Sequence, residues 1–369
     1  MAAASLDTFI ARMPKAELHI HLEGSVRPAT LLALARRNGI ALPAANEAEL
    51  RDFYRFRDFD HFLTVYSLIC DCIQTPDDLT LMTYELGAAA AAQQIRYLEV
   101  TFTTCGRLRR GLALNDQLAG IRAGAQQVER ECGVRMQFIP DVVAEHTVEE
   151  AWTLARWAVA EHGNGICALG LAGKEVGRDA AALAPVFTYV RDAGLPRTLH
   201  AGEMVGPESI WDALTTLHAD RIGHGVRVIE DPKLLELLYA MQVPLEVCPT
   251  SNVRLGLYPD LAAHPILTLW KAGLFLTVNT DDPPMFNTTL TDEYRALAAV
   301  HGFTRDEIKE LSLNAVRAAF LPAAEKQAML VAFEVEMGTS PPNPLSIAME
   351  RGSEPPEGDD VRGTPRHSL

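Results

Sequence analysis

Histidines and carboxylates stand near the ends of several short apolar segments in this 369-residue sequence. His19 and His21 lie in AELHIHLEG, and three further residues of these types, His200, His224 and Asp281, lie in TLHAGE, RIGHG and VNTDDP. In a β-strand, side chains two residues apart point to the same face, so His19 and His21 can bind one ion together. More imidazoles and a carboxylate from later strands would complete the nitrogen and oxygen ligand set that zinc takes. A lone H-x-H is weak evidence, but four such groups at four strand ends predict a metal site.

The length and composition indicate a single large domain and argue against several other classes. Hydrophobic residues make up 48% of the chain and charged residues 22%, which is enough for a substantial core. A net charge of −15 argues against a nucleic-acid partner. The sequence contains no run of 18 apolar residues, so no membrane span is predicted. The N-terminus lacks a signal-peptide pattern, and the six cysteines form no C-x-x-C pair, so we expect a cytoplasmic protein with reduced thiols. A homo-oligomer is compatible with the sequence, which sets no oligomeric state.

Short apolar strand candidates alternate with helical segments along the chain. The eight predicted strands cover residues 16–22, 95–102, 136–143, 166–172, 197–201, 221–224, 244–249 and 275–280. This alternation predicts an α/β fold with a parallel sheet, and eight strands indicate closure into a (β/α)₈ TIM barrel. The candidate ligands all lie toward the C-terminal ends of their strands, where barrel enzymes place their chemistry.

A helical insertion is expected after the first strand, at residues 44–76. Within it, Phe59, Phe62, Tyr66 and Ile69 recur at near-helical spacing. Such an apolar stripe is commonly part of the core. An insertion at this point lies at the mouth of the barrel, however, so a hydrophobic lid over the substrate is the alternative.

The domain organisation follows from this pattern. Residues 1–338 are predicted to form one catalytic barrel domain. Residues 339–369 are rich in Pro, Gly and charged residues and poor in aromatics, so this tail is predicted to be disordered.

Five segments together resemble the motif series of the adenosine deaminase family, within the amidohydrolase superfamily. The segments are MPKAELHIHLEGS, LHAGE, RIGHGV, CPTSN and NTDDP, and the resemblance runs from about residue 10 to 335. It implies a (β/α)₈ barrel that hydrolytically deaminates adenine-type purines at C6, with one zinc ion per chain. Matched motif by motif, it also implies that the metal ligands are His19, His21, His200 and Asp281.

The expected chemistry assigns roles to four more residues. Replacing the amine at C6 needs a hydroxide at neutral pH, which zinc supplies by lowering the pKa of bound water to about 7. Glu203 is the candidate acid that protonates N1, and His224 would orient or deprotonate the water. Asp282 can form a hydrogen bond with N7, and the backbone of Gly173 can approach N3. Alternatively, Asp282 is a turn residue before proline and Gly173 only ends a strand.

Three positions depart from the adenosine-specific pattern and bear on the substrate, a small-molecule purine nucleoside. Glu23 stands where these enzymes usually carry Asp, at a position expected to meet the ribose 5′-hydroxyl. Thr101 replaces an arginine, and Lys174 replaces an Asp at the barrel mouth. Adenosine, converted to inosine, is the first expectation; 6-aminodeoxyfutalosine, 5′-methylthioadenosine and free adenine are the rivals.

Two functions of other classes stay open at this point. A carboxylated Lys174 could bridge two metals in a binuclear amidohydrolase, although Glu203 and the tandem Asp281–Asp282 are not required there. The second is a non-catalytic purine-binding protein, which typically has lost a ligand or the acid. Iron or manganese could also occupy the same ligands as zinc.

Overall fold

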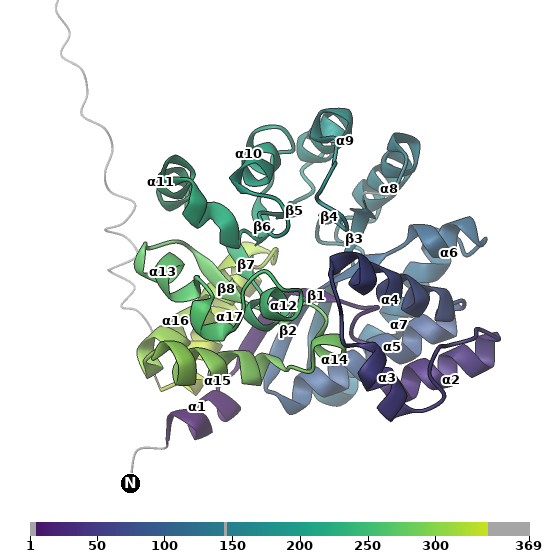
Figure 1. The fold of residues 1–369 in the computed structure, drawn as a ribbon, viewed down its shortest axis with the longest axis horizontal. Coiled ribbons are helices and arrows are strands. Elements are labelled where there is room, and N and C mark those ends of the chain that lie inside the picture. Colours follow the sequence, from purple (N-terminus) through teal and green to yellow (C-terminus); the bar gives the residue numbers. More distant parts are fainter. Residues whose placement is uncertain (1–4, 144–145, 339–369) are drawn as a thin grey trace, which may run out of the picture.

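Eight parallel strands form the centre of the computed structural model, which describes residues 5–143 and 146–338 (Figure 1). Each strand pairs with its neighbour in the sequence. The strands are β1 (Lys15–His21), β2 (Ile95–Thr103), β3 (Arg135–Val143), β4 (Leu169–Ala172), β5 (Arg197–Ala201), β6 (Arg221–His224), β7 (Leu245–Val247) and β8 (Leu276–Val278). The segment after β8 returns to β1, where the His21 N–H donates to the Asp281 carbonyl at 2.9 Å. The sheet is thus a nearly closed barrel, which confirms the predicted (β/α)₈ fold.

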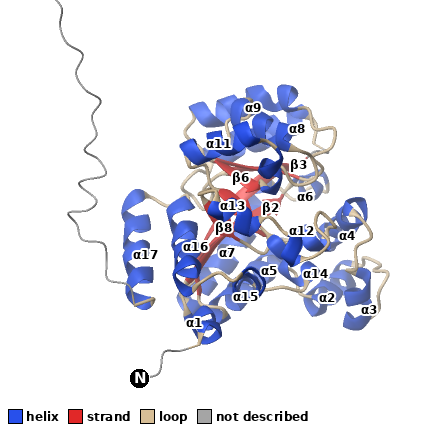
Figure 2. Cartoon of the chain, turned by 60° about the vertical axis from the view of Figure 1, so that its left-hand side comes forward, coloured by secondary structure: helices blue, strands red, loops and turns tan. Residues whose placement is uncertain are grey.

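Helices surround the strands on the outside (Figure 2). Those of the first half are α1 (Leu6–Arg12), α2 (Pro28–Asn38), α3 (Glu47–Phe53), α4 (Phe59–Cys72), α5 (Pro76–Ala92), α6 (Cys105–Arg109), α7 (Leu114–Cys132) and α8 (Val148–Ala160). Those of the second half are α9 (Ala180–Asp192), α10 (Pro207–Thr215), α11 (Pro232–Met241), α12 (Pro249–Arg254), α13 (Ile266–Lys271), α14 (Pro283–Phe286), α15 (Leu290–His301), α16 (Arg305–Ala318) and α17 (Ala323–Glu336). Two short 3₁₀ segments, Val226–Glu230 and Leu261–Ala263, complete the set among the described residues.

Local sequence signals explain where several helices begin and end. At the start of α5, the Thr75 side chain accepts a hydrogen bond from the Asp78 N–H while Asp78 accepts one from the Thr75 N–H. This reciprocal capping box satisfies two of the free N–H groups of the first turn. In α2, Pro28 occupies the first turn and Gly39 ends the helix at a φ of 68°, a left-handed conformation that favours glycine.

Three strands are shorter than predicted, and for two of them the residue type at the strand end gives the reason. The strand predicted over 275–280 ends at Val278. After it, the Asn279 carboxamide oxygen replaces a main-chain carbonyl as the acceptor for β1: the N–H groups of Leu18 and His19 donate to it at 3.0 and 3.1 Å. Strand β7 ends before Pro249, which has no N–H to donate. Of the segment 166–172, the strand proper begins at Leu169.

The segment 44–76 contains α3 and α4 and lies at the barrel mouth. Phe59, Phe62 and Tyr66 of α4 line a cavity there, whereas Ile69 is buried in the core. Whether α4 moves as a lid stays a prediction. The tail predicted to be disordered, 339–369, lies outside the described residues. None of the described helices is both long enough and apolar enough to cross a membrane.

Candidate active site

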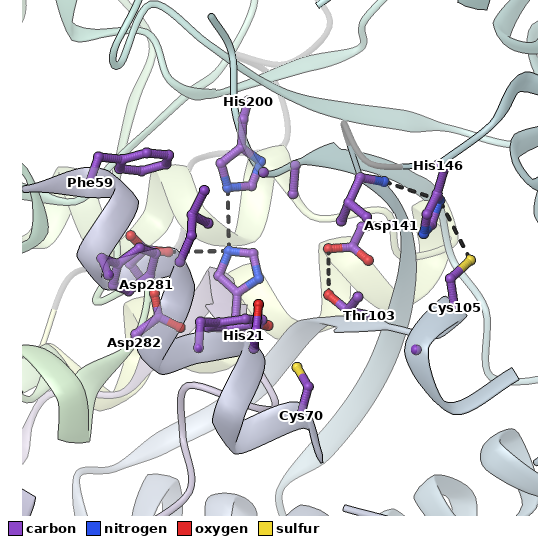
Figure 3. Close-up of a pocket in the computed structure, with 18 of the residues that line it drawn as sticks. His21, Phe59, Cys70, Thr103, Cys105, Asp141, His146, His200, Asp281 and Asp282 are labelled. Atoms are coloured by element: carbon purple, nitrogen blue, oxygen red, sulfur yellow. Dashed lines mark hydrogen bonds and ion pairs between the residues drawn. The ribbon is translucent and has the colours of Figure 1, made fainter. Parts of the chain in front are cut away.

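Five ionisable side chains from four strand ends meet at the mouth of the barrel, and Figure 3 labels three of them, His21, His200 and Asp281. Asp281 Oδ1 lies 3.4 Å from His19 Nε2 and 3.2 Å from His21 Nε2, and His21 Nε2 lies 3.3 Å from His200 Nε2. One ligand atom from each of His19, His200, His224 and Asp281 lies within 4.8 Å of the others. The structure therefore brings together all four ligands implied by the family resemblance, and places His224 beside them.

Hydrogen bonds behind the histidines decide which ring nitrogens face the centre. His19 Nδ1 lies 2.8 Å from the Glu246 carboxylate, and His200 Nδ1 lies 2.9 Å from the Leu171 carbonyl. Both partners are acceptors, so these Nδ1 atoms carry the proton and the Nε2 lone pairs point inward, as metal-binding imidazoles require. His21 Nδ1 has no hydrogen-bond partner within the described residues.

His224 is oriented the opposite way. The amide nitrogen of Asn252 lies 3.2 Å from His224 Nδ1, which therefore accepts, and the Asn252 oxygen in turn lies 3.1 Å from His264 Nε2. A neutral His224 consequently carries its proton on Nε2, 3.6 Å from Glu203 Oε1. Burial and the neighbouring His19 lower the pKa of His224 to about 3, so the ring stays neutral. This arrangement makes His224 a hydrogen-bond donor rather than a fifth ligand.

The residues present fit a divalent metal ion. Three imidazole nitrogens and one carboxylate form an N₃O donor set, which zinc favours; His19, His21 and Asp281 are buried and His200 is partly buried. Ser251 Oγ donates to the second oxygen of Asp281 at 2.7 Å and fixes this carboxylate. Although burial lowers the pKa of His19, Asp281 and Glu246 outweigh it and raise the value to about 9. Asp281 and Glu246 thus favour a positive charge at this site, and a bound cation would provide it.

Glu203 is held next to this cluster by the loop that follows β5. Its side chain is buried, and burial, with Asp281 and Glu175 adding, raises its pKa well above the usual value. The Glu175 carboxylate accepts from the main-chain N–H groups of Glu203, Met204 and Val205 at 3.2, 2.5 and 2.8 Å. Burial thus favours the protonated form of Glu203, and the bonds to Glu175 fix the main chain that carries it, as a general acid requires.

Asp282 and Gly173 both line the cavity beside the cluster. Burial and Asp281 raise the pKa of Asp282, and its Oδ1 has no partner among residues 5–143 and 146–338. Gly24, in the first motif, leaves room for this carboxylate, because a Cβ at Gly24 would lie 1.6 Å from Asp282 Oδ1. Asp281 and His224 themselves have φ angles of 68° and 59°, and such left-handed backbone is commonly found at functional sites.

Glu23 lies behind the cavity wall and is fully buried. Its Oε1 accepts from Arg107 Nη2 at 2.7 Å and from the Thr103 N–H at 3.2 Å, and its Oε2 accepts from the Tyr66 hydroxyl at 3.1 Å. Both oxygens of its carboxylate thus accept hydrogen bonds from the protein itself. The predicted contact with a 5′-hydroxyl stays a prediction. Lys174, in turn, bonds Asp60 of α4 at 2.9 Å and lies outside the group of candidate ligands.

The cluster opens into a cavity of about 490 Å³. Its wall is apolar on the side of α4, and polar where β2 and β3 end. Four lining residues on that polar side were not recognised in the sequence: Thr103, Arg107, Asp141 and His146. The position of Asp141 near the C-terminal end of a predicted barrel strand was the one signal that could have identified it. Burial raises its pKa to about 7.

Comparisons with known proteins agree with this geometry. Residues 14–334 match the family described as "Adenosine deaminase". The chain is 40% identical over 323 residues to aminodeoxyfutalosine deaminase of Streptomyces avermitilis, covering 87% of this chain and 90% of the relative. Adenine deaminase from Arthrobacter aurescens superposes with a TM-score of 0.83 at 36% identity, covering 88% and 98% of the two chains. An amidohydrolase from Burkhoderia ambifaria with bound Zn gives 0.82 at 28% identity, covering 92% and 94%.

Proposed function

Because the chain belongs to the adenosine deaminase family and is a hydrolase acting on C–N bonds of cyclic amidines, we propose that it deaminates an adenine carried on a sugar. Water replaces the amine at C6, and the products are a 6-oxopurine nucleoside and ammonia. The observation that carries this proposal is the buried Glu203, whose pKa is raised, beside three inward-facing Nε2 atoms and Asp281.

We propose one zinc ion per chain, held by His19, His21, His200 and Asp281. The ion would supply a hydroxide at neutral pH by lowering the pKa of a water to about 7. The zinc bound to the Burkhoderia relative supports this choice of metal.

The protein's own residues perform the remaining steps. Glu203 donates its proton to N1, which draws electrons into the ring and makes C6 electrophilic. The Nε2–H of His224 donates a hydrogen bond to the oxygen that attacks C6. The Glu203 carboxylate, having given up its proton, then takes the proton of the hydroxyl now on C6 and passes it to the amine. The C–N bond breaks, ammonia leaves, and C6 becomes a carbonyl while N1 keeps its proton. Asp282 and the main chain at Gly173 hold the two further ring nitrogens, N7 and N3, and so keep C6 in place.

For the substrate, we place 6-aminodeoxyfutalosine before adenosine, which reverses the order expected from the sequence. Two observations support this choice. The relative described above that acts on aminodeoxyfutalosine is 40% identical. The cavity of about 490 Å³ lies within the range of roughly 300–1,000 Å³ typical of pockets for drug-sized ligands, which is more than a bare purine needs. Free adenine is the second candidate, because the Arthrobacter structure is an adenine deaminase.

Ammonia release from a panel of substrates tests the proposal. The panel is 6-aminodeoxyfutalosine, adenosine, 5′-methylthioadenosine and adenine, compared by kcat/KM. We expect the largest value for aminodeoxyfutalosine and the smallest for adenine. Adenine as the best substrate, with nucleosides inactive, would contradict the proposal.

We further propose a cytoplasmic location, which the six free cysteines support.

A further inference from the structure

The polar side of the cavity contains a buried acceptor that no protein group uses. Asp141 lies on β3, and its Oδ2 accepts from Thr103 Oγ1 at 3.0 Å. Its other oxygen, Oδ1, is buried and has no partner in the described part of the chain, although Asp141 is only 1% exposed and lines the cavity. A buried carboxylate oxygen without a donor is costly, and a ligand that donates a hydrogen bond removes this cost.

A buried donor accompanies this acceptor. The Val143 N–H points to His146 Nδ1 at 3.3 Å, so the neutral His146 ring carries its proton on Nε2. Nε2 is buried and, over residues 5–143 and 146–338, has no partner. Figure 3 shows Asp141 and His146 on one side of the cavity, across from Asp281 and Asp282. An unused acceptor and an unused donor on one wall are complementary to hydroxyl groups, which both donate and accept.

The order of the strands shows which part of the substrate faces this wall. In the proposed function, Glu203 after β5 meets N1, Gly173 after β4 meets N3, and Asp282 after β8 meets N7. The edge of a purine presents N1, N3, N9 and N7 in that order. Around the barrel, the strands between β4 and β8 on the remaining side are β3, β2 and β1. N9, which carries the sugar, therefore faces the side on which Asp141 and Thr103 lie.

We propose that Asp141 and His146 form a subsite for the sugar hydroxyls of the substrate, in which Asp141 Oδ1 accepts from a hydroxyl and His146 Nε2 donates to one. This inference rests on the proposed function, since it needs the purine in the orientation given above. The subsite makes the enzyme selective for a hydroxylated sugar over a deoxy sugar and over the free base.

The test compares Asp141→Asn with a matched control. Asparagine keeps the shape of the side chain, and by accepting from Thr103 it turns an NH₂ group toward the cavity. Asp71→Asn is the control, because Asp71 also lines the cavity but is exposed at its rim and paired with Arg110. His146→Phe is the second variant, since it keeps a ring and removes the donor.

The substrates are adenosine, 2′-deoxyadenosine, 3′-deoxyadenosine and adenine, with metal content measured for every variant. In the wild type we expect loss of the contacted hydroxyl to lower kcat/KM by about 10–100-fold, the range for a hydrogen bond to a charged group. Asp141→Asn should lower kcat/KM for adenosine by a similar factor and leave the deoxy analogue and adenine nearly unchanged. His146→Phe should act in the same direction, and Asp71→Asn should preserve the selectivity.

Three outcomes would overturn the inference. Equal losses for adenosine and adenine in Asp141→Asn would mean that Asp141 supports the site as a whole and does not contact a sugar hydroxyl. Equal kcat/KM values of the wild-type enzyme for adenosine and both deoxy analogues would show that the enzyme binds neither sugar hydroxyl. The proposed function would remain intact. Wild-type enzyme that turns over adenine but no nucleoside would refute the proposed function, and the subsite with it.

Discussion

The barrel mouth has two unlike halves. In the half built by β1 and β5–β8, most reactive side chains are held from behind by fixed partners: Glu246 holds His19, Ser251 holds Asp281, and Asn252 orients His224. His21 Nδ1 and Asp282 Oδ1 are the exceptions there, since neither has a partner among the described residues. In the half built by β2, β3 and α6, polar atoms are buried but unused within the described residues. These atoms are Arg107 Nη1, Asp141 Oδ1 and His146 Nε2.

This difference teaches which half performs chemistry and which half recognises the substrate. Hydrogen bonds from behind fix the tautomers and directions of catalytic groups, which the reaction needs before the substrate arrives. Unused buried donors and acceptors, by contrast, gain their partners only when a ligand binds. We therefore expect substitutions in the first half to affect all substrates equally, and substitutions in the second half to separate one substrate from another.

The largest expected effect comes from removal of the metal. Dialysis against a chelator should abolish deamination of every substrate, because the first half cannot generate a hydroxide without the ion. About one equivalent of Zn²⁺ per chain should restore activity. Lys174→Ala is the control and should keep that stoichiometry, since Lys174 bonds Asp60 outside the cluster. Two equivalents in the wild type and one in Lys174→Ala would instead support a binuclear site.

Glu203→Gln should cause the next largest loss. The carboxamide of this variant cannot protonate N1, so kcat should fall about 10²–10⁴-fold while the metal content stays unchanged. Burial raises the pKa of Glu203 and so favours its acid form, and wild-type kcat should fall as the pH rises through that raised pKa. Glu208→Gln, at an exposed position five residues further along the chain, is the matched control. A near-normal kcat in Glu203→Gln would remove this residue from the mechanism.

The first half could be predicted from the sequence because its ligands occupy strand ends in short, recognisable segments. His19 and His21 illustrate this, since the two-residue spacing of a strand already places both on one face. The barrel followed from the alternation of eight strands with helices. The predicted strand ends differ from the observed ones. At Asn279, for example, a side-chain oxygen accepts the hydrogen bonds that a main-chain carbonyl would otherwise accept.

The second half could not be predicted, because its contacts join residues distant in the sequence. Nothing in the sequence shows that Arg107 lies against Glu23, 84 positions away, or that the free oxygen of Asp141 faces the cavity. Glu23 was assigned a substrate role from its position in a motif alone. Its three protein partners depend on where α4 and α6 pack, which local patterns do not determine.

Glu23→Ala tests whether that residue belongs to the fold or to substrate recognition. The substitution leaves Arg107 buried without its carboxylate, so the free energy of unfolding should fall by about 3–5 kcal/mol. Chemical denaturation measures this change. Adding Arg107→Met should recover part of the loss, because it removes the unpaired charge. Glu325→Ala, which breaks the exposed pair with Arg135, should cost only about 0–1 kcal/mol.

The kinetic readout of Glu23→Ala separates the two explanations. If Glu23 supports the wall, adenosine and 5′-methylthioadenosine should lose kcat/KM equally. A loss confined to adenosine, at unchanged stability, would show that Glu23 contacts the 5′-hydroxyl, as the sequence alone predicted. Glu23 would then belong with the residues that recognise the substrate.

The smallest expected effect tests the partners that hold the first half from behind. Ser251→Ala removes the hydrogen bond to Asp281 Oδ2 with almost no change in volume. Loss of such an outer partner typically lowers metal affinity about 10–100-fold, because the ligating carboxylate becomes free to rotate. Competition with a chromophoric chelator measures that affinity. The control is Ser312→Ala, since Ser312 is also buried and donates to a carbonyl, that of Pro14, which precedes β1. An equal, small effect of both variants would mean that Asp281 is positioned by its backbone alone, and that the first half depends less on its outer partners than the geometry indicates.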